Sequence, residues 1–459
     1  MKNEFKGFYS LQEEEFKRLW NNAIFVFDTN VLLNLYRYQE STTEQLIKVI
    51  EHLKDRVWVP YHVALEYQRN RLKVIASQNA KFSEVRKVID KGTSSLKGEI
   101  DGLNLKKRHS TIEPESFIND MNAAAKRFLD ELERLEANHF SVVSEDQIRV
   151  RLDSLLLGRI GSKPEDQKAI STLEKEAEER FKNKVPPGYM DDDKEKSDEP
   201  IFSYGNLTYQ RKFSDYIVWS QIIDFASKSD ISDLIFITDD NKEDWWLKIK
   251  QNGEKTISPR PELVGEIAEK TKIQRFHMYN SESFLKYANE VLSAGVPREA
   301  IEEVRDVARI RDRERDRMLV MRNMGYSTEK AVYDWLSDQY GEESLSQPRH
   351  APVDIIAKLD GKTIAFDVKA VRHPRHSIDR LRHSIYEAHY FSDKNDIDEL
   401  VFVLVTFDVS FVDSIKRVLE RRFVDFPPTT IIIGVAELNE ETGMVSGFVP
   451  YDQFRLESA

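Results

Sequence analysis

The sequence contains no cysteine among its 459 residues. This absence excludes disulfide bonds, thiolate zinc sites and cysteine nucleophiles, and it is typical of chains that stay outside oxidising compartments. A run of about 18 apolar residues, which a membrane span requires, does not occur, and the N-terminal segment lacks the apolar core of a signal peptide. We therefore expect a cytoplasmic protein that has no membrane partner.

Glycine-rich phosphate-binding loops are also missing. The 17 glycines form neither the GxGxxG pattern of dinucleotide-binding folds nor the GxxxxGK pattern of nucleotide hydrolases, which excludes an ATPase or a dehydrogenase of those types. Positive net charge is lacking too, because the chain carries a formal charge of −12 at pH 7. Broad non-specific binding of nucleic acid is thus disfavoured, although local basic patches can bind phosphates on an acidic protein.

The chain has enough apolar side chains to form globular domains, since 40% of its residues are hydrophobic and 32% are charged. Its length predicts two or three domains at ~150 residues each. In the first part, short apolar runs are separated by helical patterns, which predicts an α/β fold. The expected strands begin at Ala23, Val57, Leu234 and Lys272.

Acidic side chains follow several of these expected strands. Asp28 comes directly after the first strand, Glu66 lies in the helix after the second, and Asp240 follows residues 234–238. Asp215 lies in the helix before that segment. Because the carboxyl ends of parallel strands meet at one edge of a sheet, we expect these side chains to converge. Clustered carboxylates repel one another unless a cation neutralises them, and oxygen ligands select Mg²⁺ or Mn²⁺.

Each of these residues also has an ordinary structural interpretation. Asp28 fits the cap of a helix, Glu66 fits a solvated helix surface, and Asp239-Asp240 fits a turn. Only the order of the motifs along the chain favours the metal site over these alternatives.

That order resembles the PIN-like nuclease superfamily, and in particular its larger bacterial domain with a helical insertion. The motifs that carry the resemblance, which covers residues 1–290, are FVFDTNVLLNLYRY, VPYHVALEYQRNR, PPGYMDDDK ahead of KFSDYIVWSQII, and LIFITDDNKEDWW followed by PRPEL. It implies a Rossmann-like fold and a nuclease, with RNA as the usual substrate and structured DNA in some relatives. The implied catalytic and metal-binding residues are Asp28, Glu66, Asp215 and Asp240, with Asp239 and Asp244 competing for the fourth position and Asn30 and Thr238 in support.

A long helical segment divides this domain. Residues 71–184 have a strongly helical pattern, so the domain itself is expected to consist of residues 1–70 and 185–295. A dimer interface and a clamp over the substrate both fit this insertion. Residues 184–196 contain Pro, Gly and an acidic run, which predicts an exposed loop. Residues 296–324 are dense in charges of both signs and are expected to form a solvated helical linker.

A hairpin near the C-terminal end carries a second group of charged residues. Asp360-Gly361 lies between two alternating runs and predicts a two-residue turn. Counting back from the turn places Asp354 opposite Asp367, with Lys369 on the same face as Asp367 and an apolar core on the other face. Like charges that face each other are destabilising unless a positive group lies between them, so we expect a metal ion there.

This hairpin resembles the PD-(D/E)XK restriction-endonuclease-like superfamily over residues 325–440. The resemblance implies catalytic roles for Asp354, Asp367 and Lys369 within a smaller α/β domain of residues 325–459. The structural alternative is a cross-strand salt bridge between Asp354 and Lys369 on a solvated face.

The combined hypothesis is a two-domain α/β protein that hydrolyses phosphodiester bonds with Mg²⁺ or Mn²⁺. RNA cleavage through the PIN-like domain is the first expectation, in phage defence or nucleic-acid turnover. Three alternatives stay open: DNA cleavage through the C-terminal domain, nucleic-acid binding without catalysis, and a toxin-like ribonuclease controlled by a regulatory protein partner. A homodimer is also compatible with the sequence.

Overall fold

The computed structural model describes most of the chain in two compact units, Met1–Ile310 and Arg311–Ala459. The described residues are 1, 4–105, 111–191, 199–251, 253–348, 351–372, 374–422, 427–439 and 442–456. We describe each unit by itself.

The first unit contains a four-stranded parallel sheet with the strand order β2-β1-β5-β8. Its strands are β1 (Ile24–Phe27), β2 (Val57–Trp58), β5 (Asp233–Ile237) and β8 (Arg275–Tyr279). Each lies within or next to an expected strand, so the predicted α/β fold is confirmed. Because all four strands run in the same direction, the ends of β1 at Phe27 and of β5 at Ile237 share one edge.

The helices of this unit contribute several of its large buried side chains. They are α1 (Glu13–Asn22), α2 (Thr29–Asn34), α3 (Glu40–His52), α7 (Gln147–Leu155), α8 (Gln167–Lys182), α9 (Ser214–Lys228), α10 (Pro261–Lys270) and α11 (Ser281–Leu292). Trp20 of α1 and Phe284 of α11 stack with ring centroids 5.9 Å apart, and the Phe25 ring of β1 lies 5.3 Å from that of Trp20. Aromatic packing of this kind fixes both helices on the sheet.

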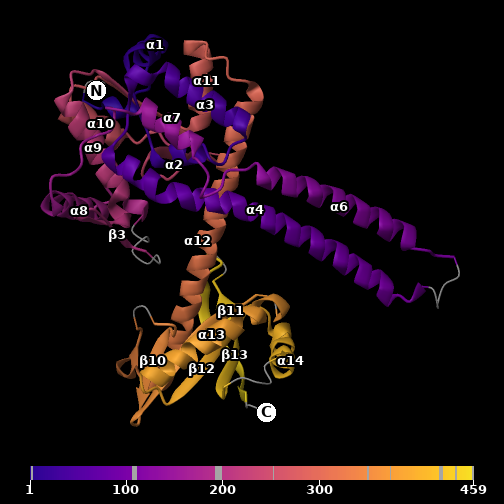
Figure 1. Ribbon diagram of the computed structural model, residues 1–459. Coiled ribbons are helices and arrows are strands. Elements are labelled where there is room, and N and C mark those ends of the chain that lie inside the picture. Colours follow the sequence, from indigo (N-terminus) through magenta and orange to yellow (C-terminus); the bar gives the residue numbers. More distant parts are fainter. Residues whose placement is uncertain are drawn as a thin grey trace. The chain divides into compact units, whose positions relative to one another are not determined.

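Two long helices lie in the first part of the predicted insertion. Helix α4 (Tyr61–Gly102) begins next to the sheet, and α6 (Glu115–Ala137) packs alongside its outer part. Figure 1 shows the pair extending away from the sheet and its covering helices. Within α6, only Ile118 and Leu132 are buried, so most of the apolar side chains on this hairpin remain accessible.

Two antiparallel hairpins in this unit were not predicted from the sequence. They are β3 (Ile201–Tyr204) with β4 (Leu207–Gln210), and β6 (Trp246–Lys250) with β7 (Glu254–Pro259). The strands are short and partly exposed, β3 and β7 lack a regular apolar alternation, and the alternation in β4 spans only four residues.

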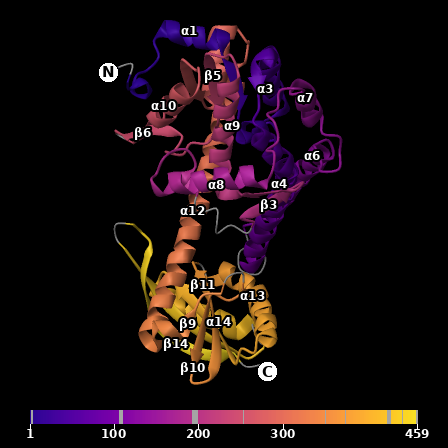
Figure 2. The same ribbon diagram turned by 90° about the vertical axis from the view of Figure 1, so that its left-hand side faces the viewer.

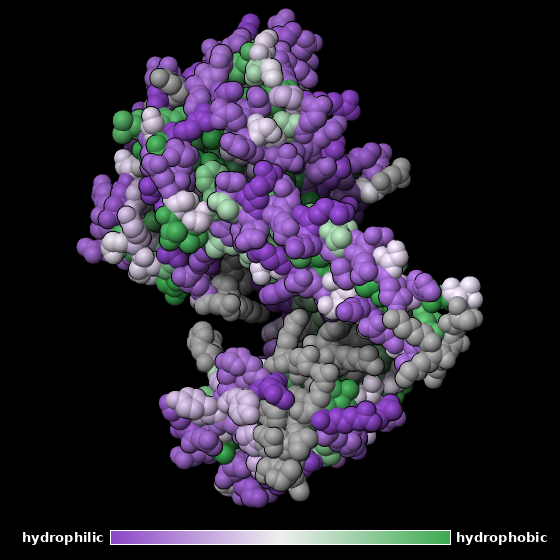
Figure 3. Space-filling view, turned by 45° about the vertical axis from the view of Figure 1, so that its right-hand side comes forward, coloured by the Kyte–Doolittle hydropathy of each residue, from purple (hydrophilic) through white to green (hydrophobic). Residues whose placement is uncertain are grey.

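The surface carries the polar residues that the composition leads one to expect. Figure 3 shows a face on which hydrophilic residues dominate and hydrophobic ones are scattered. In the part of the chain that the structure describes, no helix combines the length and the apolar character needed to cross a bilayer.

The second unit contains a mixed six-stranded sheet with the order β14-β13-β12-β11-β10-β9. Its strands are β9 (Leu345–Ser346), β10 (Ile355–Leu359), β11 (Lys362–Val371), β12 (Glu399–Thr406), β13 (Thr429–Leu438) and β14 (Val445–Leu456). The three central strands are parallel, and the outer pairings are antiparallel. The expected pairing of Ile355 with Phe366 and of Leu359 with Lys362 is confirmed.

Both faces of this sheet carry buried apolar side chains, so the face of Asp367, which was expected to carry the charged group opposite an apolar core, also holds a core. Helices α13 (Pro374–Lys394) and α14 (Val412–Arg422) lie next to each other and pack on one face, which includes Ala365 of β11 (Figure 2). The end of α12 packs on the other, which includes Phe366. Parallel strands need crossover helices, and those helices bury the face on which they lie.

Helix α12 (Arg298–Tyr340) is one continuous helix of 43 residues. Ala300 and Val304 near its start belong to the core of the first unit, whereas Val332 and Leu336 near its end belong to a core of the second. The charged segment expected as a linker therefore lies inside this helix. The exact domain boundaries stay a prediction.

Candidate metal centre

Asp28 lies at the carboxyl end of β1 and caps helix α2. Its Oδ1 accepts a hydrogen bond from the backbone N–H of Thr29 at 2.7 Å. Its Oδ2 accepts two more, from Asn30 Nδ2 at 2.6 Å and from Thr238 Oγ1 at 2.6 Å. The helix cap and the metal site were considered as alternatives, but the same carboxylate can serve both purposes because each of its oxygens has more than one lone pair.

The other predicted acids gather near Asp28. Glu66 of α4 accepts a hydrogen bond from Thr29 Oγ1 at 3.0 Å, Asp215 lies in the first turn of α9, and Asp240 follows β5. Burial, and then the negative charges of Asp215, Asp240 and Glu66, raise the pKa of Asp28 to about 7. The structure thus brings together the four acids that the sequence placed in one site.

A lysine that the sequence analysis did not single out lies among these carboxylates. Lys242 Nζ is 2.6 Å from Asp191 Oδ1, 2.8 Å from Asp240 Oδ2 and 3.4 Å from Asp215 Oδ2. Asp191 was not selected either, because it lies in the segment expected to be an exposed loop. That expectation is wrong for this residue, whose side chain is only 4% exposed.

Asp244 also belongs to this neighbourhood. Its Oδ2 accepts hydrogen bonds from the backbone N–H groups of Gly188 at 2.9 Å and Met190 at 3.1 Å, while its buried Oδ1 has no partner among the described residues. Burial, and then the charge of Asp215, raise the pKa of Asp244 to about 7. A buried carboxylate oxygen without a partner is costly unless something fills its coordination.

Gly188 permits the close approach of this loop. Its φ of +97° lies in the region that favours glycine, and a Cβ atom there would lie 3.2 Å from Asp215 Cβ. A side chain at this position would push the loop, and with it the N–H donor to Asp244, away from the carboxylates.

Asp239 occupies a different position from its neighbour Asp240. Its Oδ1 accepts from the backbone N–H of Ser281 at 2.8 Å, and its Oδ2 accepts from Ser281 Oγ and from Asn34 Nδ2, both at 2.8 Å. The carboxylate therefore ties β5 to helices α11 and α2. These hydrogen bonds give Asp239 a structural role, and its inclusion among the expected ligands stays a prediction.

The donor set fits a hard divalent cation, although the side chains are arranged around Lys242. They offer carboxylate oxygens, the ligands that Mg²⁺ and Mn²⁺ prefer, together with the partnerless Oδ1 of Asp244. Among the described residues, no three carboxylate or histidine side chains are spaced to hold one metal ion. The ammonium of Lys242 lies instead between three of the carboxylates.

The charged group of the second unit is arranged differently from the salt bridge between Asp354 and Lys369 that was its structural alternative. Lys369 forms its ion pair with Asp367, two residues away on the same strand. Asp354 Oδ2 accepts a hydrogen bond from the backbone N–H of Val368 at 2.7 Å. Asp367 is 1% exposed, and its Oδ2 has no hydrogen-bond donor among the described residues. Burial and the negative charge of Asp354 raise the pKa of Asp367 to about 7, although the positive charge of Lys369 lowers it.

The structure adds an acidic residue to this second group. Burial, and then the charge of Asp354, raise the pKa of Glu329 on α12 to about 7, and Lys369 opposes that shift. The sequence analysis missed Glu329, because nothing in a charged helical pattern shows which face turns toward the sheet. The group thus contains three carboxylates and one lysine.

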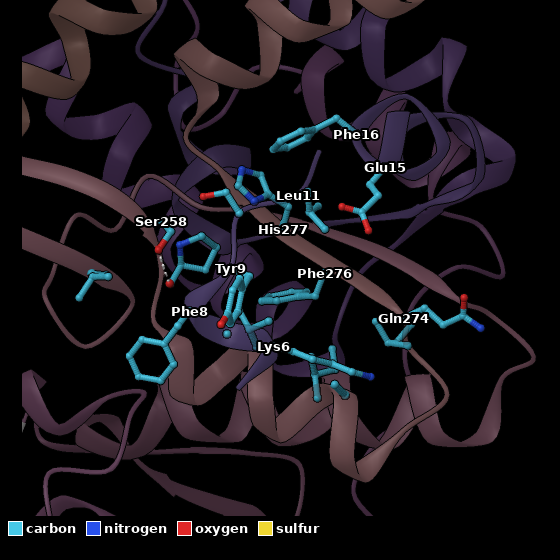
Figure 4. Close-up of a pocket in the computed structure, with 18 of the residues that line it drawn as sticks. Lys6, Phe8, Tyr9, Leu11, Glu15, Phe16, Ser258, Gln274, Phe276 and His277 are labelled. Atoms are coloured by element: carbon cyan, nitrogen blue, oxygen red, sulfur yellow. Dashed lines mark hydrogen bonds between the residues drawn. The ribbon is translucent and has the colours of Figure 1, made fainter. Parts of the chain in front are cut away.

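A pocket of about 700 Å³ lies apart from both groups. The N-terminal segment with Phe8 and Tyr9 lines one side of it, and Phe276 and His277 of β8 line another (Figure 4). The described residues that line it include none of the acidic candidates.

Comparison with known proteins covers the segment that carries the first of these two groups. A family model described as a PIN-like domain matches residues 24–263, which is more than half of the chain and includes the acids from Asp28 to Asp244. No curated protein and no solved structure matches the chain. The family match ends before the second unit, so the resemblance of that unit to restriction endonucleases stays a prediction.

Proposed function

The chain belongs to the PIN-like domain family, and on that premise we propose that it is a metal-dependent nuclease that hydrolyses phosphodiester bonds, with RNA as its main substrate. The observation that carries the proposal is the position of Asp28 among other carboxylates. Asp28 is fixed at the end of β1 by Asn30 and Thr238, and it faces the charges of Asp215, Asp240 and Glu66.

We propose that Asp28, Glu66, Asp215 and Asp240 hold Mg²⁺ or Mn²⁺, with Asp191 and Asp244 as further ligands. A divalent ion in such a site activates water and neutralises the charge that develops on the phosphate. Asn30 and Thr238 do not need to touch the ion, because they orient Asp28 through its Oδ2. Asp244 supplies the oxygen that has no partner among the described residues.

The test measures cleavage of labelled single-stranded RNA, single-stranded DNA and duplex DNA with Mg²⁺, with Mn²⁺ and with EDTA. The protein is compared with Asp28→Asn and with the control Asp55→Asn, whose side chain is 84% exposed and pairs with Arg159. We expect cleavage of RNA that EDTA abolishes, that Asp28→Asn loses and that Asp55→Asn retains. Equal activity of both variants would refute this assignment.

A second candidate function is DNA cleavage through the C-terminal unit. Asp367 Oδ2, which is buried and accepts no hydrogen bond from the described residues, supports it, as does Glu329 beside Asp354. The discriminating variant is Asp367→Asn, with Asp334→Asn on α12 as the control because Asp334 is exposed and pairs only locally with Lys330. Loss of duplex DNA cleavage in Asp367→Asn alone would support this candidate.

Two other interpretations predict different results in the same assays. A protein that binds nucleic acid without cutting it would retain its cellular activity in Asp28→Asn. A toxin-like ribonuclease held by a regulatory partner would be isolated with a small protein bound. A role in phage defence or nucleic-acid turnover rests on analogy with other nucleases, and plaque formation on cells with and without the gene tests it.

A further inference from the structure

Lys242 is held in place by its own backbone. It lies two residues after Asp240, and its N–H donates to Asp240 Oδ1 at 3.0 Å. Its carbonyl oxygen accepts from the N–H groups of Trp245 and Trp246, both at 3.2 Å. These tryptophans are 2% and 8% exposed, so the turn that carries Lys242 is anchored in the core. The fold therefore fixes the backbone from which the Lys242 side chain extends.

The Lys242 ammonium joins three segments that are far apart in the sequence. Asp191 lies in the loop before β3, Asp215 begins α9, and Asp240 follows β5. Each contributes a carboxylate within 3.4 Å of Nζ. The Lys242 side chain is 16% exposed, so water screens these contacts less than it screens surface pairs.

We propose that Lys242 is a built-in countercation: its ammonium occupies the centre of the carboxylate cluster in the metal-free protein and gives up that position when a divalent cation binds. The inference rests on the proposed function, because it assumes that Asp191, Asp215 and Asp240 are metal ligands. Lys242 is a positioning residue in this scheme, since it keeps the carboxylates gathered while no metal is present.

The physical basis is a competition between two cations for the same oxygens. Carboxylates that share a site repel one another, and one ammonium offsets part of that repulsion. A divalent ion carries twice the charge and binds several oxygens at once, so it displaces the ammonium. Lysine suits this exchange, because its charge lies on a flexible four-carbon stem and can move without moving the backbone.

The first experiment uses the unmodified protein. An amine-acylating reagent, sulfosuccinimidyl acetate, is applied in EDTA and in Mg²⁺ at equal ionic strength, and acetylation of each lysine is followed by mass spectrometry. Lys248 is the matched control, because its side chain is 13% exposed and forms an ion pair with Glu254 at 2.7 Å outside the carboxylate cluster. We expect Mg²⁺ to increase the acetylation rate of Lys242 several-fold and to leave that of Lys248 unchanged.

The second experiment measures Mn²⁺ binding by calorimetry for the wild type, Lys242→Met and Lys248→Met. Removal of the competing charge should tighten Mn²⁺ binding roughly tenfold in Lys242→Met, as a lost charge contact near a protein surface permits. Lys248→Met should bind as the wild type does. If Lys242→Met does not fold, the acetylation experiment still decides the question.

The outcomes separate this inference from the proposed function. If Mg²⁺ leaves the acetylation of Lys242 unchanged or lowers it while the wild type binds Mn²⁺ and cuts RNA, the inference is wrong and the proposed function stands. Mn²⁺ binding by Lys242→Met that is equal to or weaker than that of the wild type overturns it in the same way. If neither the wild type nor Lys242→Met binds Mn²⁺, both the inference and the proposed ligand set are wrong.

Discussion

The adjacent residues Asp239 and Asp240 should respond in opposite ways to the same substitution. Asp239 accepts three hydrogen bonds from Ser281 and Asn34, and bonds to a charged acceptor contribute about 1.5–3 kcal/mol each. An asparagine keeps one acceptor oxygen, but its amide N–H group would face the donors of Ser281 or Asn34. We therefore expect Asp239→Asn to lower the free energy of unfolding by about 2–4 kcal/mol.

Asp240→Asn should instead cost less than Asp239→Asn, because the loss of its contact with Lys242 is offset by relief of the repulsion from nearby carboxylates. Urea unfolding measures both free energies, and cleavage of labelled RNA with Mn²⁺ measures activity below the unfolding transition. We expect Asp240→Asn to be stable and inactive, and Asp239→Asn to be unstable but active while folded. An Asp239→Asn variant that is as stable as the wild type and inactive would refute the assignment.

Three further predictions concern stability. Asp146 accepts hydrogen bonds from Arg71 Nη1 and from the Arg149 N–H, both at 2.9 Å, so Asp146→Ala leaves the Arg71 charge without this partner and should cost about 3–5 kcal/mol in urea unfolding. Burial lowers the pKa of His277 to about 4 from 6.5, so the unfolded chain binds the extra proton between these values. As pH drops through that window, the stability of the wild type should therefore fall relative to that of His277→Phe by up to about 1.4 kcal/mol per unit. A Cβ at Gly434 would lie 2.3 Å from the Phe448 ring, so Gly434→Ala should destabilise the second unit by about 1–3 kcal/mol. Gly265→Ala is the control: a Cβ there meets open space, so this variant should not destabilise the first unit.

Local patterns predicted the parts of the fold that local chemistry determines. The hairpin of β10 and β11 follows from Asp360-Gly361, whose φ values of +49° and +82° are those that a tight two-residue turn requires. That turn fixes the register, and the register places Ile355 opposite Phe366 as predicted. The covering of both sheet faces could not be predicted in this way, because it depends on where the crossover helices pack.

The candidate site also divides into residues that local patterns predict and residues that depend on distant contacts. Asp28 and Asp240 were predicted because each follows a buried strand, and strand ends converge in a parallel sheet. Asp191 and Lys242 were missed because the ion pairs of Lys242 with Asp191 and Asp215 join segments that are far apart in the sequence, and no local pattern records such contacts. The sequence left Asp239 and Asp240 in competition, and the hydrogen bond that distinguishes them comes from Ser281 at the start of α11, which binds Asp239.

The supporting residues explain how a site assembled from distant segments keeps its geometry. Asn30 Nδ2 donates to Asp28 Oδ2, while Asn30 Oδ1 accepts from the Asp239 N–H at 2.9 Å. Thr238 Oγ1 donates to Asp28 and accepts from the Asp240 N–H at 3.0 Å. These two side chains therefore bond the end of β1 to the end of β5 in both directions. Asp28 and Asp240 are placed relative to each other by this pair of bridges, and the cluster needs no bound ion to bring its two strand ends together.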